Sequence, residues 1–422
     1  MSSTPDWVRA MQASFPLSPL PKGDYKECSI DSENDCNLSD MQRDTSTVVY
    51  PGGETRCIFS DSGPFGFQVI PGDSDKLLFD FQGGGACWDW VSTEFKACST
   101  SANPSSQDGW FDRTNRLNPF QNYTVVHVLY CSGDLHAGNV TREYKDKAGE
   151  PVVQIGHVNT MSVLRWAKKN LKSHALSSLI IGGCSAGSVA TQLWASTLLE
   201  EFTYERAAVI ADSFAMVFPP GSEGPLMNSY GLCDVYPALI KNASLLRECA
   251  KGTLEFPPLY MDAMKRNPSV AFSNINSKYD STQRAYYSGV AATDSYSFDP
   301  FVLNVTKPLF LTTAEFCDGM NEIFKGYNEL DNYISFVVTS SQHCYTPYSL
   351  MYTATTMGTD GGQSTATTLV EWLQKFPVST GDSQYSECDG PVLDEVDWTG
   401  DDYCDASQYG KIFTQTVAAG RE

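Results

Sequence analysis

The sequence has little positive charge and no long apolar run. Lysine and arginine account for 29 of the 422 residues, against 50 aspartates and glutamates, and the formal net charge is -21. Proteins that bind nucleic acids gather basic side chains along the phosphates, so this composition predicts that the chain binds none. No stretch of 18 or more apolar residues occurs, and we therefore expect no membrane span.

Internal repeats, low-complexity linkers and C-x-x-C pairs are missing as well. Without repeats or linkers, we predict one domain over residues 1–422, with a core of about 55–376 between an N-terminal extension (1–54) and a C-terminal extension (377–422). Without C-x-x-C pairs we expect no metal site. Residues 1–5 also lack the basic and apolar regions of a signal peptide.

Cysteines, by contrast, are plentiful at thirteen. Their spacing suggests local disulfides that staple the extensions and loops, namely Cys28 with Cys36, Cys87 with Cys98, Cys233 with Cys249 and Cys388 with Cys404. An odd count leaves one thiol over, and Cys184 is our candidate. Five N-x-S/T sequons accompany the cysteines, at Asn37, Asn122, Asn139, Asn242 and Asn304. Together these features predict a secreted glycoprotein.

From about residue 65 onward, short β-rich runs alternate with helical patterns. This alternation predicts an α/β fold with a mostly parallel central sheet flanked by helices. The expected strands cover residues 66–70, 77–81, 124–130, 178–182, 207–211, 270–275 and 333–339. The expected helices cover residues 161–172, 188–202 and 366–376. Residues 219–267, rich in proline, glycine and aromatics, look like an insertion above the sheet that shapes a pocket.

The run 178–182 ends in Gly183-Cys184-Ser185-Ala186-Gly187, and a helical pattern follows. G-x-S-x-G between a strand and a helix is typical of a nucleophile elbow, in which glycines allow a tight turn that lifts the serine hydroxyl above the sheet. The alternative is a glycine-rich turn that only packs tightly or binds phosphate. No lysine follows as in a P-loop, so we take Ser185 as a nucleophile.

A serine nucleophile needs a base, usually histidine, and in this architecture the base follows the serine in the chain. Only five histidines are present. Four of them precede Ser185, namely His127, His136, His157 and His174. His343, in the loop after the last expected strand, is therefore the predicted base.

The carboxylate that orients the base should follow a strand between Ser185 and His343. Asp212, Asp280 and Asp318 compete for this role. We choose Asp280, because it lies in the loop after the penultimate expected strand. Asp212 is then a structural or capping carboxylate, and Asp318 a surface or secondary-site residue.

Two further stretches should surround the serine. The glycines after residue 81 can offer main-chain N–H donors to an oxyanion from Gly84, Gly85 and Ala86, together with the N–H of Ala186. Other residues are candidates for substrate contact or for structure. Trp88 and Trp90 are either an aromatic wall or core residues, and Asp134 and His136 either line the pocket rim or pin a loop.

Taken in order, the motifs resemble the pectin acetylesterase and Notum family of α/β-hydrolase-fold carboxylesterases over residues 55–347. The motifs are Gly83-Gly84-Gly85 with Cys87, Tyr130-Cys131-Ser132-Gly133-Asp134, Gly183-Cys184-Ser185-Ala186-Gly187, Tyr279-Asp280-Ser281 with Gln283, and His343-Cys344. The resemblance implies an α/β-hydrolase fold, the triad Ser185, Asp280 and His343, and an oxyanion hole from Gly84, Gly85 and Ala186.

The sequence thus favours a secreted serine carboxylesterase that removes an acyl group, with acetyl as the first choice, from a polysaccharide such as pectin. The reaction needs no cofactor and no metal, and its partner is an ester, an acylated carbohydrate in our interpretation. A lipid or fatty-acyl ester hydrolase is the alternative enzyme. A binding protein on an inactive hydrolase scaffold is the alternative from another class.

Overall fold

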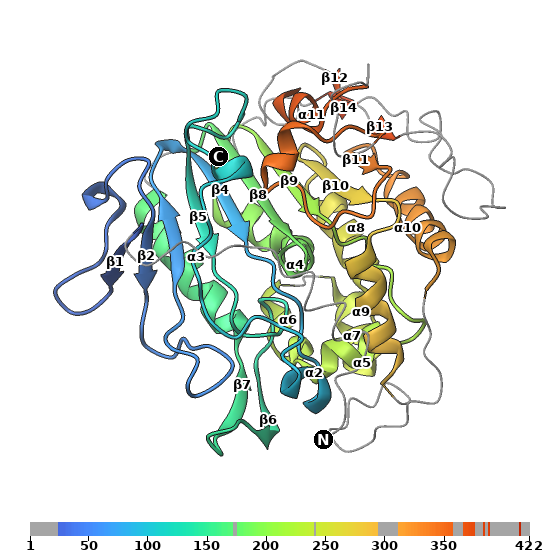
Figure 1. Cartoon of the computed structure of the whole chain (residues 1–422), viewed down its shortest axis with the longest axis horizontal. Coiled ribbons are helices and arrows are strands. Elements are labelled where there is room, and N and C mark those ends of the chain that lie inside the picture. Colours follow the sequence, from blue (N-terminus) through green and yellow to red (C-terminus); the bar gives the residue numbers. More distant parts are fainter. Residues whose placement is uncertain are drawn as a thin grey trace.

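A ten-stranded, mostly parallel sheet forms the centre of the protein (Figure 1). The computed structural model describes residues 24–171, 175–239, 242–293, 311–357 and 366–375, and three two-residue strands beyond them. In spatial order the strands are β1 (Lys26–Ser29), β2 (Thr47–Tyr50), β3 (Phe67–Ile70), β5 (Tyr123–Val128), β4 (Asp73–Phe81), β8 (Ser178–Cys184), β9 (Ala207–Asp212), β10 (Ala271–Ser277), β11 (Tyr333–Val338) and β13 (Glu387–Cys388). Strand β3 alone among them runs antiparallel to its neighbours.

All seven expected strands lie in this sheet, which confirms the predicted α/β fold. The N-terminal extension differs from the expectation, because β1 and β2 continue the sheet at its edge instead of covering the core. The first three residues of β2 are buried, so residues 47–49 already belong to the core. Most of the C-terminal extension lies outside the described residues.

The alternation of side chains along β4 explains the layers of the fold. Leu77, Phe79 and Phe81 point to one face, where they pack with helices α3 (Gly156–Leu171), α4 (Ala186–Glu201), α8 (Phe256–Arg266), α9 (Ser281–Ala291) and α10 (Thr313–Tyr327). Leu78 points to the other face, which α11 (Leu369–Lys375) covers. Apolar side chains on both faces bury the central parallel strands β8, β9, β10 and β11 along their whole length, as such sheets require.

The predicted insertion folds into helices. Residues 219–267 form α5 (Glu223–Ser229), α6 (Leu232–Leu239), α7 (Ala243–Lys251) and α8, and α8 joins the helical layer on the sheet. The smaller elements are α2 (Trp90–Glu94), the β6 (Val140–Lys145) and β7 (Pro151–Gln154) hairpin, and the pair β12 (Ser383–Gln384) and β14 (Phe413–Thr414). Among the helices described, none combines the length and hydropathy that crossing a bilayer demands.

Five disulfides link the described residues, and three of them are the predicted pairs Cys28–Cys36, Cys87–Cys98 and Cys233–Cys249. A fourth joins Cys57 to Cys131. The predicted Cys388–Cys404 pair lies outside the residues whose side chains are described. The prediction for Cys184 is wrong, because Cys184 bonds to Cys344, 160 residues away in sequence. Cys317, buried in α10, forms no disulfide with another described cysteine.

Candidate active site

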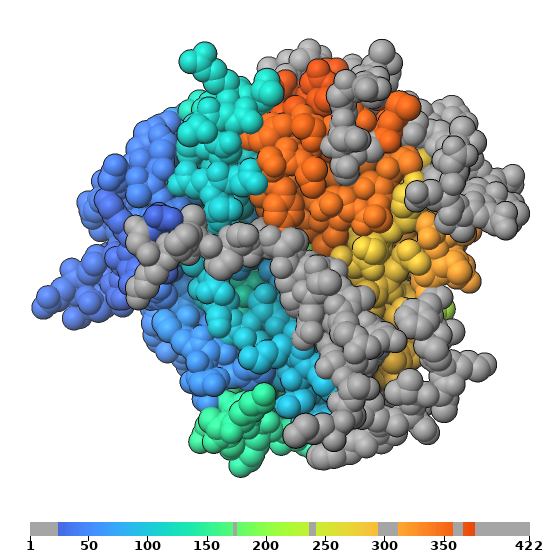
Figure 2. All heavy atoms as spheres, viewed as in Figure 1, coloured from blue at the N-terminus to red at the C-terminus, as the bar shows by residue number. Residues whose placement is uncertain are grey.

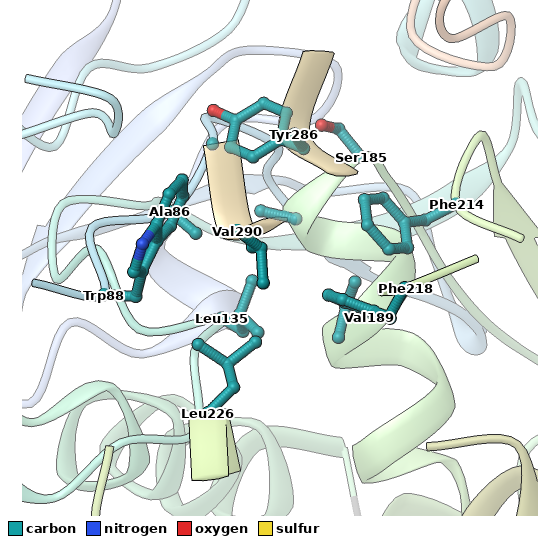
Figure 3. Close-up of a pocket in the computed structure, with 12 residues that line it drawn as sticks. Ala86, Trp88, Leu135, Ser185, Val189, Phe214, Phe218, Leu226, Tyr286 and Val290 are labelled. Carbon is teal, nitrogen blue, oxygen red and sulfur yellow. The ribbon is translucent and has the colours of Figure 1, made fainter. Parts of the chain in front are cut away.

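Ser185 lies in a strained turn between β8 and α4. Its φ of 61° and ψ of -122° are rarely adopted by residues other than glycine. Although Ser185 occupies the N-cap position of α4, its hydroxyl makes no capping hydrogen bond, unlike a typical serine there. The hydroxyl is therefore not engaged in capping the helix. Ser185 lines the pocket shown in Figure 3.

Gly183 and Gly187, on either side of Ser185, are required because the backbone at the end of β4 lies very close to them. A Cβ on Gly187 would lie only 1.9 Å from the carbonyl oxygen of Phe81. A Cβ on Gly183 would lie 2.5 Å from the carbonyl oxygen of Gly187 and 2.6 Å from that of Phe81. The turn after β8 is thus packed directly against the end of β4, and this contact explains the spacing of the two glycines around Ser185.

His343 follows β11, as predicted, and contacts Asp280. The Nδ1 atom of His343 lies 2.7 Å from Oδ2 of Asp280. The imidazole is buried, with 7% of the residue exposed, and its Nε2 atom has no hydrogen-bond partner among the described residues, Ser185 included. With the proton on Nδ1 held by the carboxylate, Nε2 is left as a base. Its contact with a serine hydroxyl commonly tightens only when substrate binds.

Asp280 is fully buried and fixed by its own helix. It caps α9, where its Oδ1 accepts hydrogen bonds from the N–H groups of Thr282 and Gln283 at 2.9 Å. Its Oδ2, which faces His343, also accepts a bond of 2.8 Å from the side-chain amide of Gln283. Three hydrogen-bond donors thus hold the carboxylate toward the imidazole, and this makes Asp280 the best placed of the three acids.

The other two acids have different surroundings. Asp318 is exposed on α10. Asp212 is fully buried at the end of β9, and its Oδ2 accepts from the N–H groups of Tyr345 and Thr346 at 2.8 and 2.7 Å. Burial raises the pKa of Asp212, although these hydrogen bonds oppose the rise. Asp212 therefore anchors the chain just after His343 and is a structural carboxylate, as expected.

The glycine loop after β4 lies beside the serine, since a Cβ on Gly83 would approach Cβ of Ser185 to 3.1 Å. Gly84 and Gly85 have φ values of 144° and 74°. The N–H of Ala86 donates to the carbonyl of Ala97 at 3.1 Å, so this third candidate donor is already used. The N–H groups of Gly84, Gly85 and Ala186 have no partner among the described residues and could bind an oxyanion.

An apolar pocket extends from Ser185. It encloses about 400 Å³ of empty space, its open mouth included. Figure 3 shows Ser185 and Tyr286 at one end and Leu135 and Leu226 at the other. The lining residues are Gly85, Ala86, Trp88, Leu135, Ser185, Ala186, Val189, Phe214, Phe218, Leu226, Tyr286 and Val290.

The polar tips of the two largest aromatic side chains point away from this pocket. The indole N–H of Trp88 donates to the hydroxyl of Thr293 at 3.2 Å, and the hydroxyl of Tyr286 donates to the carbonyl of Ala97 at 2.7 Å. The pocket therefore meets only the ring surfaces, and Trp88 belongs to its wall. Trp90, by contrast, is 38% exposed and lies outside this pocket.

Asp134 and His136 do not line the pocket, and the structure corrects their placement as substrate-binding candidates. Asp134 is fully buried and accepts from the hydroxyl of Ser132 and the N–H of Gly156, both at 2.6 Å. His136 stacks on Tyr130 at a centroid distance of 4.4 Å, and its Nε2 lies 2.8 Å from the carbonyl oxygen of Gln82. Burial lowers the pKa of His136 to about 3, so it stays neutral. Both residues pin loops.

Some residues of the site were not found from the sequence. Gln283 bridges three elements, because its amide binds Asp280 and Asn276 while its oxygen accepts from the N–H of Ala215. Phe214 and Phe218, in the loop after β9, and Val290, in α9, also line the pocket. The sequence offered a hint only for Gln283, which lies at helical spacing from Asp280, and none for the apolar residues.

One group of metal-ligating residue types occurs among the described residues, formed by Cys184, His343 and Cys344. The ligand atoms of these residues lie within 4.8 Å of one another. Because the two sulfur atoms form a disulfide, neither is a free thiolate that could bind a metal ion. The cluster instead establishes that the imidazole lies close to the residue preceding Ser185.

Comparison with known proteins identifies a similar fold and a family. The fold is similar to the crystal structure of the Wnt deacylase Notum from Drosophila, with a TM-score of 0.50 and 14% sequence identity over 77% of this chain and 90% of that one. A search of curated proteins finds no match. The family model for pectinacetylesterase matches residues 57–392, most of the chain and every candidate residue above. The chain therefore belongs to the pectinacetylesterase family.

Proposed function

We propose that the protein is a serine carboxylesterase in which Ser185 is the nucleophile, His343 the base and Asp280 the carboxylate that orients the base. Family membership supports the coarser statement that it is an acyl esterase. The observation that carries the finer proposal is the 2.7 Å contact between Nδ1 of His343 and Oδ2 of Asp280, in a loop bonded covalently to the residue before Ser185.

In the first half of the reaction, the Ser185 hydroxyl attacks the ester carbonyl and its proton passes to Nε2 of His343. Asp280 stays ionised and stabilises the imidazolium through Nδ1–H. The N–H groups of Gly84, Gly85 and Ala186 hold the tetrahedral oxyanion, and each such donor contributes about 2.7–4 kcal/mol in comparable sites. The imidazolium then protonates the departing alcohol, and an acyl-enzyme remains.

In the second half, water attacks the acyl-enzyme, and His343 takes the proton of that water. Collapse of the second tetrahedral intermediate returns the proton to Ser185 and releases the acid. The description of the family supports an acetyl ester on a polysaccharide such as pectin as the substrate. The five disulfides support secretion, because such bonds persist in oxidising compartments.

Replacement of Ser185 tests this proposal. We expect Ser185→Ala to lower kcat for an aryl acetate by at least about 10³-fold, because the acyl-enzyme can no longer form. Ser188→Ala is the matched control, since Ser188 is a buried serine one turn along α4 whose hydroxyl has no partner among the described residues. Undiminished turnover by Ser185→Ala would place the nucleophile elsewhere.

The apolar pocket supports a second candidate, a hydrolase of longer acyl esters. The pocket runs from Ser185 to Leu226 between apolar side chains, so a chain longer than acetyl would bury apolar surface against Phe214, Leu226 and Val290. A series of aryl esters from acetate to palmitate separates the candidates. If the pocket accepts the acyl chain, kcat/KM rises beyond acetate, and Val290→Trp shifts the optimum to shorter chains. A maximum at acetate, unmoved by this substitution, favours the acetylesterase.

A serine-directed organophosphonate separates both enzymes from the inactive binding protein. We expect this probe to label Ser185, because only an activated hydroxyl attacks it at neutral pH. The same probe should fail with His343→Ala, since that variant lacks the base. Failure to label the unmodified protein would favour a binding protein on a hydrolase scaffold.

A further inference from the structure

The disulfide between Cys184 and Cys344 joins the two halves of the proposed site. Cys184 directly precedes Ser185, and Cys344 directly follows His343. The two cysteines are 160 residues apart in sequence, and both are buried, with 6% and 2% of each residue exposed. Among the disulfides of the described residues, this one alone connects segments that carry two different members of the proposed triad.

The backbone at both ends of this bond is strained. Ser185 has a φ of 61° and Cys344 a φ of 68°, values that cost about 1–3 kcal/mol each for residues other than glycine. Such conformations persist only where the surroundings hold them. On the serine side, the turn is held by the close contact of Gly183 and Gly187 with β4. The loop of His343 is buried as well, and hydrogen bonds to Ser213 and Asp212 hold it in place.

Hydrogen bonds to the end of β9 supplement the covalent link. The N–H of Ser185 donates to the carbonyl oxygen of Asp212 at 2.9 Å, and the N–H of Cys344 donates to the hydroxyl of Ser213 at 2.8 Å. Both segments are therefore aligned on adjacent residues at the end of β9, and the disulfide links them to each other directly. No hydrogen bond to a described residue restrains Nε2 of His343 itself.

We propose that the Cys184–Cys344 disulfide is a positioning element that holds His343 in reach of Ser185 during turnover. The inference rests on the proposed function. Proton transfer demands a heavy-atom separation of about 3 Å, and a misplacement of 1 Å can cost about 100-fold in rate. Because the bond joins residues adjacent in sequence to Ser185 and His343, its loss should lower kcat rather than substrate affinity.

The test compares the double variant Cys184→Ser/Cys344→Ser with the double variant Cys28→Ser/Cys36→Ser. The control bond lies in the N-terminal segment, which is blue in Figure 2 and is separated on that face from the orange segment that carries His343. Assays with an aryl acetate are run at a temperature at which circular dichroism shows each variant folded. We expect kcat to fall about 10- to 100-fold without Cys184–Cys344, with KM within about twofold of the unmodified protein, and to be unchanged in the control.

A kcat within about twofold of the unmodified protein would overturn the inference, and so would an equal loss in the control. If the unmodified protein hydrolyses no ester, the proposed function fails and the inference fails with it.

A double variant that does not fold is replaced by the unmodified protein treated with a phosphine. The phosphine and one water molecule reduce the disulfide to two thiols, with the water oxygen leaving in the phosphine oxide. Alkylation and mass spectrometry then follow each bond. Activity should be lost in step with Cys184–Cys344, and full activity after its reduction would contradict the proposal.

Discussion

At the residue scale, the surroundings of Asp280 and Asp212 determine the role of each carboxylate. Asp280 and Asp212 are both fully buried. One oxygen of Asp280 faces an imidazole, whereas Asp212 accepts hydrogen bonds from backbone N–H and hydroxyl groups. A carboxylate that faces His343 can stabilise a positive charge there. One surrounded by neutral donors holds a loop in place.

This difference predicts unequal effects of removing charge. Asp280→Asn should lower kcat by about 10³- to 10⁴-fold, because an amide donor at Oδ2 disfavours the imidazole tautomer that keeps Nε2 free. Asp318→Asn should leave kcat within about twofold, since Asp318 is exposed on α10. Steady-state kinetics with an aryl acetate measures both. A larger loss for Asp318→Asn would mean that the wrong carboxylate had been chosen.

At the element scale, the site depends on how closely the end of β8 approaches the end of β4. The parallel pairing of these strands aligns Phe81 with Gly183. The helix that begins at Ala186 therefore starts directly beside the glycine loop after β4. At Gly187, no room remains for a side chain. The strained φ of Ser185 is the consequence of turning from β8 into α4 within this space.

The close approach predicts that Gly187→Ala is strongly destabilising. Its Cβ would lie 1.9 Å from the carbonyl oxygen of Phe81, which is backbone and cannot move without shifting β4. We expect a loss of about 2–4 kcal/mol in the free energy of unfolding, measured by urea denaturation. Gly326→Ala, at an open position in α10, is the control and should not destabilise the protein. Equal stability of the two variants would contradict the packing described here.

At the scale of the whole molecule, the insertion couples the pocket to the helical layer. Leu226 of this region lines the pocket, and Glu223 of α5 accepts a hydrogen bond of 2.6 Å from the N–H of Phe256, where α8 begins. Burial, with a smaller contribution from Glu255, raises the pKa of Glu223 to about 8. The carboxyl group is therefore protonated in the folded protein at neutral pH.

This shift predicts that stability falls as pH rises from about 4.5 to 8. Over that range the folded protein keeps the proton of Glu223, whereas the unfolded chain has released it, so raising the pH favours unfolding. Glu223→Gln stays neutral and should remove this pH dependence, which amounts to about 3–4 kcal/mol between pH 5 and pH 8. Urea denaturation of both proteins at pH 5 and pH 8 measures it. Equal slopes with pH for the two proteins would contradict the raised pKa.

The sequence by itself determined the seven central strands, three of the helices, the G-x-S-x-G turn and the chain order that leaves His343 as the only downstream histidine. These features are local, because periodicity, glycine spacing and residue order need no knowledge of distant contacts. Tertiary structure alone decided the partner of Cys184, the burial of Asp134 and His136, and the apolar wall of the pocket. Each of these features depends on contacts between segments that are far apart in sequence. The sheet brings these segments together, and the sequence of one segment does not indicate which other segment it contacts.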